Sequence, residues 1–364
     1  MADDRIAVFH CQGTSYLFNL GGILIEMPSE GPLLVNGESG RQVTVAGIDG
    51  RNATWDLTPP NDPFPWMLDP AIFDAKKVAY SASLAPGNVS IDTGINELKK
   101  LMLRLTPGQP FCLVGYSQGA GVCSEAWAHG LKPGSTGWFE PYRDQFLGGC
   151  FFGNPRRAVN HRGEVGGTWS GSWDVDGSNS GGHGVFPTTD AAFPRLTDCE
   201  GYWVEFTAPD DIFSSVGDST KGVHFSEASD DLLMVGRGGV FSFLAGLGPK
   251  LDAANEAMFG DDAVGKQLNY FLDADDNYFH VGGNGHMAYA FMPPPNSDGS
   301  YNETTTVIGG HTYRKAVSDT MYQTALKYLT GLAAQYATSG SVLPPTPTAP
   351  SAAGWSTTLI PPAA

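Results

Sequence analysis

Short apolar runs bounded by turn residues dominate the hydrophobic pattern of the first 210 residues. Strands that are covered on both faces read as nearly continuous apolar sequence, so these runs are interpreted as core strands of a parallel sheet. The clearest runs span residues 6–9, 111–114, 146–152 and 202–206, and a shorter one spans 77–80.

Apolar residues with helical spacing separate these strands. One set is spaced by four, three, four and three residues, which places its members on one face of a helix over 91–105. Its members are Ile91, Ile95, Leu98, Met102 and Leu105. Residues 119–128 and 314–336 predict two further helices. Strands and helices that alternate in this way predict an α/β fold with a central parallel sheet.

The composition divides the chain into four predicted parts. An α/β core is followed by a helical insertion, by a return to the core that ends in a helix, and by an extended tail rich in Pro, Thr and Ala. These parts are residues 1–218, 219–275, 276–340 and 341–364. Two turn-rich stretches, 30–75 and 156–200, predict long surface connections.

The chain is strongly acidic, with 21 Lys and Arg against 38 Asp and Glu and a formal net charge of −17. Such a surface repels phosphate backbones and anionic lipid headgroups, which argues against a nucleic-acid partner. No apolar run approaches the roughly 18 residues of a membrane span, so we expect no stable membrane insertion. The N-terminus lacks the basic and apolar regions of a Sec signal peptide.

The five cysteines form no Cys-x-x-Cys pair and predict neither a disulfide framework nor a zinc site. We expect most of them to be reduced and buried: Cys11, Cys112, Cys123, Cys150 and Cys199. An acidic turn at 273–277 begins like a calcium loop, but Tyr278 and Asn284 stand where that loop needs glycine and glutamate. The sequence therefore predicts no metal and no cofactor.

Gly115-Tyr-Ser-Gln-Gly119 matches the nucleophile-elbow pattern, in which a serine stands on a strained turn between a strand and a helix. The two glycines leave room for that turn, and the helix that follows directs backbone N–H groups at a developing oxyanion. The motif alone is weak in a chain so rich in Gly and Ser. The strand before it and the helix after it favour Ser117 as a nucleophile over an ordinary turn.

A serine triad of this fold runs in the order Ser, then Asp or Glu, then His. The histidines downstream are His183, His224, His280, His286 and His311. His286 follows a glycine in a predicted loop and is the preferred general base. His280 lies in a strand-like run, His311 is expected to open the final helix, and His183 lies in a loop expected to be too mobile for a base.

The acid is expected on the loop after the strand at 202–206. Asp210 and Asp211 both follow that strand, and one of them can accept the Nδ1–H of the base and fix its tautomer. Two adjacent side chains cannot both face the histidine, so the other is a turn residue. Asp218 is a weaker third candidate.

Three motifs together resemble the lysin B proteins of mycobacteriophages, which are esterases related to cutinases. The motifs are Gly115-Tyr-Ser-Gln-Gly-Ala120, Phe152-Gly-Asn-Pro-Arg156 and Gly285-His-Met-Ala-Tyr289. The resemblance implies a cutinase-like α/β-hydrolase fold with a helical insertion between the catalytic Asp and His. It also implies Asp211 as the acid, because two apolar residues follow it, and Ser214 stands where cutinases have a disulfide cysteine.

The resemblance further implies the reaction. A lysin B hydrolyses the ester that joins mycolic acids to arabinogalactan in the mycobacterial envelope, so the expected partner is a lipid-esterified cell-wall polysaccharide. The oxyanion hole would combine the N–H of Gln118 with Thr14, and Gln12 is the alternative donor. The protein would be made in the host cytoplasm and would act at the bacterial envelope during lysis.

Two alternatives remain open at this point. A virion-associated, cutinase-like esterase or lipase would act during phage entry, and the Pro-rich tail with Trp355 would attach it to the particle. A non-catalytic tail protein could also keep a hydrolase fold. The presence of Ser, Asp and His in the required order argues against the second alternative.

Overall fold

The computed structural model describes only part of the chain, and every structural statement below concerns that part. It comprises residues 5–13, 16–20, 23–26, 42–46, 52–56, 64–85, 87–158, 183–186, 202–207, 213–214, 226, 289, 303–308, 311–316 and 321–339. The predicted insertion at 219–275, apart from Ser226, and the predicted tail at 341–364 lie outside the described residues. The division into four parts therefore stays a prediction.

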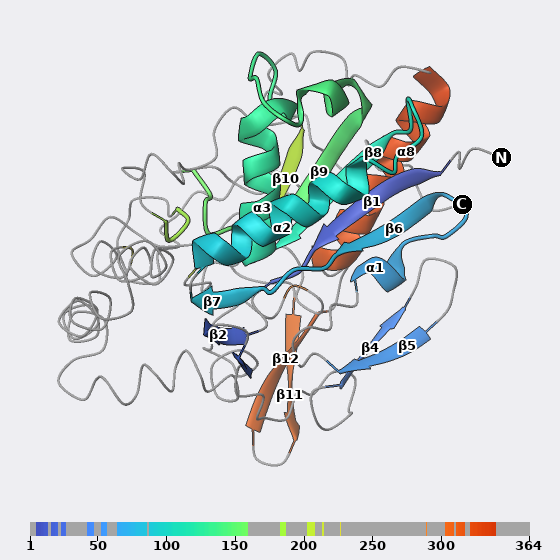
Figure 1. The fold of residues 1–364 in the computed structure, drawn as a ribbon. Helices are drawn as coiled ribbons and strands as arrows, with labels where there is room; N and C mark the ends of the chain where they lie inside the picture. The colour runs from blue at the N-terminus through green and yellow to red at the C-terminus, as the bar shows by residue number, and fades with distance from the viewer. Residues whose placement is uncertain are drawn as a thin grey trace.

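Five parallel strands form the central sheet, in the order β6-β1-β8-β9-β10 (Figure 1). Their bounds are Ile6–Cys11 for β1, Phe73–Val78 for β6, Phe111–Tyr116 for β8, Phe146–Phe152 for β9 and Trp203–Phe206 for β10. The α/β fold with a parallel sheet is thus confirmed. The strand expected at 77–80 lies earlier, because Phe73 and Val78 are the buried ends of β6 while Lys77 is exposed.

Helices cover both faces of this sheet (Figure 1). One face carries α2, Gly87–Met102, and α3, Gln118–Ala126, whereas the other carries α1, Phe64–Met67, and α8, Met321–Ser339. Strand β1 divides its side chains between the two layers, with Phe9 on the α2 and α3 side and Val8 on the α8 side. Because both layers exclude water, every β1 residue is buried, which explains its unbroken apolar run.

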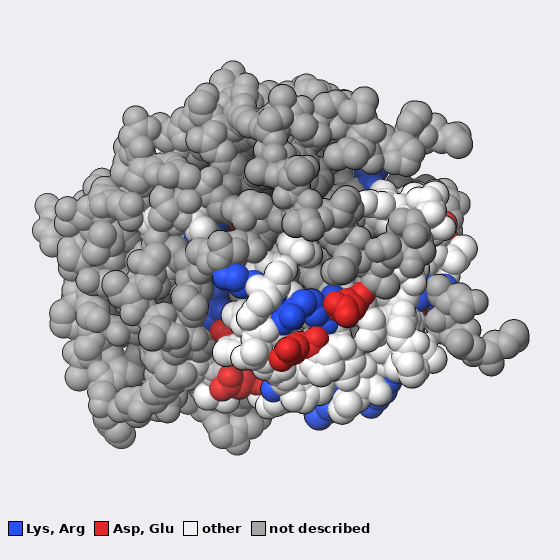
Figure 2. Space-filling model, turned by 90° about the horizontal axis from the view of Figure 1, so that it is seen from above, with Lys and Arg blue, Asp and Glu red and all other residues white. Residues whose placement is uncertain are grey.

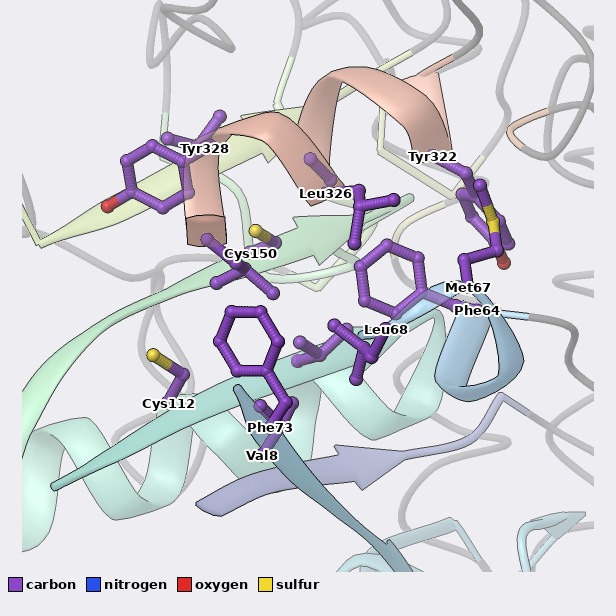
Figure 3. Packing of buried hydrophobic residues seen from close by; sticks show 14 of the residues in the cluster. Val8, Phe64, Met67, Leu68, Phe73, Cys112, Cys150, Tyr322, Leu326 and Tyr328 are labelled. Atoms are coloured by element: carbon purple, nitrogen blue, oxygen red, sulfur yellow. The ribbon is translucent and has the colours of Figure 1, made fainter. Parts of the chain in front are cut away.

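The core between α8 and the sheet is rich in aromatic and sulfur-containing side chains. Figure 3 shows Tyr322 of α8 beside Phe64 and Met67 of the α1 region. The rings of Tyr322 and Phe64 meet edge to face, with their centroids 5.2 Å apart, and Tyr322 also lies 4.6 Å from Phe152. Each such fully buried large side chain contributes about 2–3 kcal/mol to folding through the hydrophobic effect.

Two predicted helices have different bounds in the structure. The helix expected at 91–105 begins earlier, at Gly87, and ends at Met102. A turn follows, in which the Leu105 N–H donates to the Met102 carbonyl. Helix α3 continues through a π-helical turn, Trp127–Leu131, and a 3-10 helix follows at Glu140–Gln145.

The helix expected at 314–336 begins only at Met321. Residues His311–Ala316 instead form β12, which pairs antiparallel with β11, Glu303–Ile308. The threonines and the valine of β11 favour a strand. The predicted helix extended the apolar spacing of α8 too far toward the N-terminus, over part of β12. The expectation that His311 opens a helix was wrong.

Further strands lie in stretches for which the sequence predicted no strand. β2, Tyr16–Leu20, pairs with β3, Ile23–Glu26, and with β7, Ser83–Ala85. β4, Gln42–Ala46, pairs with β5, Asn52–Asp56. The turn-rich stretch 30–75 therefore includes a hairpin, a short helix and the start of a core strand.

The described part of the chain also bears on charge, cysteines and membranes. On the face that Figure 2 shows, several acidic and basic side chains of the described residues lie next to one another. Cys11, Cys112, Cys123 and Cys150 are buried free thiols, while Cys199 lies outside the described residues. Within the residues described, no helix is both long and apolar enough to cross a bilayer.

Candidate active site

The sheet order itself marks one position for a ligand. Strands β1 and β8 are neighbours in the sheet. From β1 the chain continues to β6 on one side, whereas from β8 it continues to β9 on the other side, so the strand order reverses between β1 and β8. In doubly wound sheets ligands bind outside the carboxyl ends of the strands at such a switch point. Here those ends are Cys11 of β1 and Tyr116 of β8, which directly precede Gln12 and Ser117.

Ser117 has an unusual backbone conformation at this position. Its φ of 52° and ψ of −123° are tolerated easily only by glycine, and among the described non-glycine residues Ala82 alone shares a positive φ. Holding a side chain in such a region costs of order 1–3 kcal/mol, and this kind of strain collects at functional sites. This backbone conformation turns the chain from β8 directly into α3, so the serine lies at the N-terminus of that helix.

The motif glycines are required by close backbone contacts. A Cβ at Gly119 would lie 2.0 Å from the carbonyl oxygen of Cys11, and one at Gly115 would lie 2.6 Å from the Cα of Ala120. A Cβ at Gly13 would come within 3.0 Å of the Cβ of Ser117. The loop after β1 and the start of α3 therefore pack backbone to backbone on either side of the serine.

Hydrogen bonds fix the residues that flank the serine. The buried Ser90 of α2 donates its hydroxyl to Oε1 of Gln118 at 2.8 Å, and Tyr80 donates its hydroxyl to the Gln12 carbonyl at 2.5 Å. Burial, together with the neighbouring thiols of Cys11 and Cys123, raises the pKa of Tyr80 well above its ordinary value, so the phenol stays a donor. Thr14, the second predicted oxyanion residue, lies outside the described residues.

Tyr289, the last residue of the third sequence motif, packs against the other two motifs. Its ring is buried, with its centroid 6.2 Å from that of Tyr116 and 5.8 Å from that of Phe152. Tyr116 precedes the nucleophile candidate, and Phe152 begins the Gly-Asn-Pro-Arg motif. His286, three residues before Tyr289 in the sequence, lies outside the described residues.

The predicted acids, Asp210 and Asp211, also lie outside the described residues, but the structure describes the chain on both sides of them. Strand β10 pairs with β9 and leads through Thr207 toward them. Beyond them, the carbonyl of Phe213 accepts the Val185 N–H at 2.9 Å. Their assignment as triad members stays a prediction, as does that of His286.

The turn Gly153–Arg157, called the Asn154 turn below, follows β9 and holds buried charged groups that the sequence analysis missed. Arg156 forms an ion pair of 2.6 Å with Glu125 of α3, whose other oxygen meets Nε2 of His129 at 3.0 Å. Asn154 donates Nδ2–H to Glu205 of β10 at 2.5 Å. Arg157 donates Nε–H to the Ser214 carbonyl at 2.5 Å, and both arginines are only 1% exposed.

The sequence offered one signal for this cluster. Charged residues make up only 16% of the chain, yet Arg156 and Arg157 stand side by side four and five residues after the end of a fully buried, uncharged strand. Two arginines so close to the end of a buried strand can themselves be buried, and buried arginines need carboxylate or carbonyl partners. The partners themselves come from distant segments and could not be read from the sequence.

The expected surface loop at 156–200 is corrected at one place. His183 is buried at 2% exposure, and its Nδ1 lies 2.7 Å from the Gly184 carbonyl. Gly184 lies so close to Pro155 that a Cβ would come within 2.2 Å of the Pro155 carbonyl oxygen, and its N–H bonds to the Arg157 carbonyl. The expectation of a surface position was wrong for His183, because Gly184 allows this segment to pack against the Asn154 turn.

Two upstream histidines occupy other environments. His10 is buried at the end of β1, where its ring stacks with Phe64 at 6.4 Å, and His129 lies at the surface beside Glu125. The residues that the structure describes include no group of three or more His, Cys, Asp or Glu side chains that could hold a metal ion.

The chain is similar to some solved structures of known proteins. Neither a protein-family model nor a curated protein matches the sequence. Among solved structures, lysin B from mycobacteriophage D29 aligns with a TM-score of 0.41 and 17% identity over 71% of this chain and 91% of its own. A cutinase-like protein from Cryptococcus sp. aligns at 0.33 and 13% over 66% and 96%, and the catalytic core of acetyl xylan esterase from Trichoderma reesei at 0.34 and 16% over 63% and 96%. The proteins that the sequence motifs resemble are thus among the structures similar to this chain.

Proposed function

We propose that this chain is a serine esterase that hydrolyses carboxylic esters with Ser117 as its nucleophile. The observation behind the proposal is the strained backbone of Ser117 at the switch point of the sheet and at the start of α3. A serine in that place lies between the end of a strand and the N-terminus of a helix, which is the arrangement a nucleophile elbow requires.

The proposed reaction has two halves. His286 takes the hydroxyl proton of Ser117, which attacks the ester carbonyl, and the N–H of Gln118 together with Thr14 stabilises the oxyanion. His286 then protonates the leaving alcohol, and water, activated by the same histidine, releases the acid from the acyl-enzyme. Asp211 orients the imidazole and stabilises its charged form.

Two observations support this assignment. Tyr289, three residues after His286 in the sequence, packs against Tyr116, the residue before Ser117. In the sequence, Asp210 and Asp211 follow β10 and stand between Ser117 and His286, which is the order that this fold class requires. The choice of Asp211 over Asp210 rests on the motif resemblance.

The proposed substrate is the ester between mycolic acids and arabinogalactan, as the three motifs imply. The reaction itself requires only an activated carbonyl and room for an acyl chain, so simpler esters can report on the same machinery. The proposal has therefore two levels, an ester hydrolase and a hydrolase for this lipid–polysaccharide ester, and each needs its own measurement.

The first measurement is the hydrolysis of a p-nitrophenyl ester by the wild-type protein and by Ser117→Ala. We expect kcat to fall by roughly 10⁶-fold, the size of effect seen when a serine nucleophile is removed from a triad. Ser124→Ala is the matched control, because Ser124 is a buried serine of the same helix that donates only to the Ala120 carbonyl. Equal rates for Ser117→Ala and the wild type would disprove the assignment.

The second measurement is the release of free mycolic acids from purified mycolylarabinogalactan. Release that depends on Ser117 supports the lysin-B-type reaction, whereas activity on short esters alone indicates a general cutinase-like esterase. Detection of the protein in purified phage particles would favour action during entry over action at lysis. A protein inactive on every ester would be the binding protein considered above.

A further inference from the structure

The Asn154 turn contacts both ends of the chain segment in which the triad acid is proposed. At the near end, the Gly153 N–H bonds to the carbonyl of Phe206 at 3.0 Å, and Asn154 bonds to the carboxylate of Glu205. Phe206 is the last residue of β10, so these bonds hold the strand where the segment leaves the sheet.

At the far end, Arg157 donates its Nε–H to the Ser214 carbonyl. A second bond joins the Val185 N–H to the Phe213 carbonyl, and residue 185 is itself tied to the turn because the Gly184 N–H bonds to the Arg157 carbonyl at 2.8 Å. The five residues between Thr207 and Phe213 include Asp210 and Asp211. Both flanks of that short segment are therefore fixed by one turn.

The same turn is joined to the nucleophile. The Ser117 N–H bonds to the Phe152 carbonyl at 2.8 Å, one residue before the turn begins. A single continuous stretch, residues 152–157, thus has contacts to the serine, to the strand before the proposed acids and to the backbone after them. Displacing this stretch changes the distance between the nucleophile and the acid segment.

The choice of residues indicates a role in placement. Asn154, Arg157 and Glu205 are each at most 1% exposed, and desolvating a charged group costs several kcal/mol. An apolar contact would have anchored the segment at lower cost, but it would not have fixed one carbonyl relative to another. The planar guanidinium of Arg157 donates in a set direction and keeps its charge at any relevant pH.

We propose that Arg157 and Asn154 are positioning residues that hold the acid-bearing segment in register with Ser117. The proposal rests on the esterase mechanism above and extends it to residues that touch neither substrate nor the reacting atoms. Arg156 provides an internal comparison, because it has the same chemistry and the same 1% exposure but pairs with Glu125 of α3 instead of the segment after β10.

The test is a pair of double-mutant cycles on the full chain, with kcat and KM measured on a p-nitrophenyl ester. Arg157→Gln and Arg156→Gln are each combined with Asp211→Asn, and Asp210→Asn is measured in parallel. Asp211→Asn should lower kcat by about 10⁴-fold, as loss of a triad carboxylate does. If Asp210 proves to be the acid, the same cycles are run on Asp210→Asn.

We expect Arg157→Gln to lower kcat by about 10- to 100-fold, because small misplacements of catalytic groups have effects of this size, and to leave KM nearly unchanged. In the background that lacks the acid, the same substitution should change kcat by less than about two-fold, because the group it positions is already gone. Arg156→Gln should have the same effect in both backgrounds. Arg157→Lys, which retains a donor and the charge, should recover part of the lost kcat.

Equal coupling of both arginines to the acid, or no coupling for Arg157, would overturn the positioning role while leaving the esterase proposal intact. If neither aspartate substitution lowers kcat, both the triad assignment and this inference fail. Should Arg157→Gln not fold, as judged by thermal unfolding, the Arg157→Lys cycle decides the question with the same expected coupling.

Discussion

Two turns at the same edge of the sheet follow the neighbouring strands β8 and β9, and they are built from different interactions. The turn Gly115–Gly119 is held by backbone contacts so close that its glycines have no room for a side chain. The Asn154 turn is held by buried charged and amide side chains that reach α3, β10 and the segment at 213–214.

The difference fits the two tasks proposed for these turns. A nucleophile needs one fixed backbone position relative to a helix N-terminus, and direct backbone packing gives that with few degrees of freedom. Joining several loops from distant parts of the chain requires side chains that can span the gaps, and arginine does so with directed donors. The first turn should therefore be sensitive to added volume, and the second to loss of a partner.

The largest effect is expected from added volume in the first turn. Gly119→Ala would place a methyl group 2.0 Å from the Cys11 carbonyl oxygen, and we expect it to reduce the free energy of unfolding by more than about 4 kcal/mol. Gly121→Ala on the same helix meets only the flexible end of Ile91 at 3.3 Å and should stay within about 1 kcal/mol of the wild type. Urea unfolding measures both, and similar losses would show that the backbone contact is not what matters.

Removal of a partner in the second turn should have the next largest effect. Arg156→Ala leaves the carboxylate of Glu125 largely buried without its arginine, and the free energy of unfolding should fall by about 3–5 kcal/mol. Replacing both partners, with Arg156→Met and Glu125→Leu, should be less destabilising than the single change, since no charge is left behind. A double variant as unstable as Arg156→Ala would contradict this account.

Smaller effects on stability are expected at the positive-φ residues of the two turns, Ser117 and Gly153, where glycine should stabilise and alanine should destabilise. Ser117→Gly should be more stable than Ser117→Ala by about 1 kcal/mol, because the φ of 52° is relaxed for glycine, although both variants lose the hydroxyl. At Gly153, where φ is 58°, replacement by alanine should instead cost about 1–2 kcal/mol. Thermal unfolding of the three variants and the wild type checks both signs.

The smallest expected effect concerns the buried thiol of Cys112 in β8. Burial raises the pKa of the Cys112 thiol far above its ordinary value, whereas the unfolded thiol ionises near pH 8.5. The folded protein therefore holds a proton that the unfolded chain loses, so the stability from this group is present below about pH 8.5 and is lost as the pH rises.

For one thiol the loss between pH 7 and pH 9 is about 0.8 kcal/mol. The free energy of unfolding of Cys112→Ala, measured over the same range, should fall less steeply than that of the wild type by this amount. The comparison uses the slope with pH, because the substitution also leaves a small cavity. Equal slopes would show that the thiol ionises in the folded protein.

The sequence alone determined the α/β class and the core strands β1, β8, β9 and β10, because strands buried on both faces of a sheet are mostly apolar, with buried polar exceptions such as His10 and Glu205. It also located the serine turn, since Gly115 and Gly119 are demanded by local backbone contacts that a five-residue motif can record. Its helix boundaries were less accurate, and β11 and β12 were missed because neither has the apolar run that marked the core strands.

Tertiary structure alone decided which distant residues meet. The contact of Tyr289 with Tyr116, and the partners of Asn154, Arg156 and Arg157, join segments separated by tens of residues or more. No local pattern encodes such pairs, because a buried charge constrains the sign of its partner but not the partner's place in the chain. The order of the strands likewise emerged only on folding, and it is this order that places the serine turn at the switch point of the sheet.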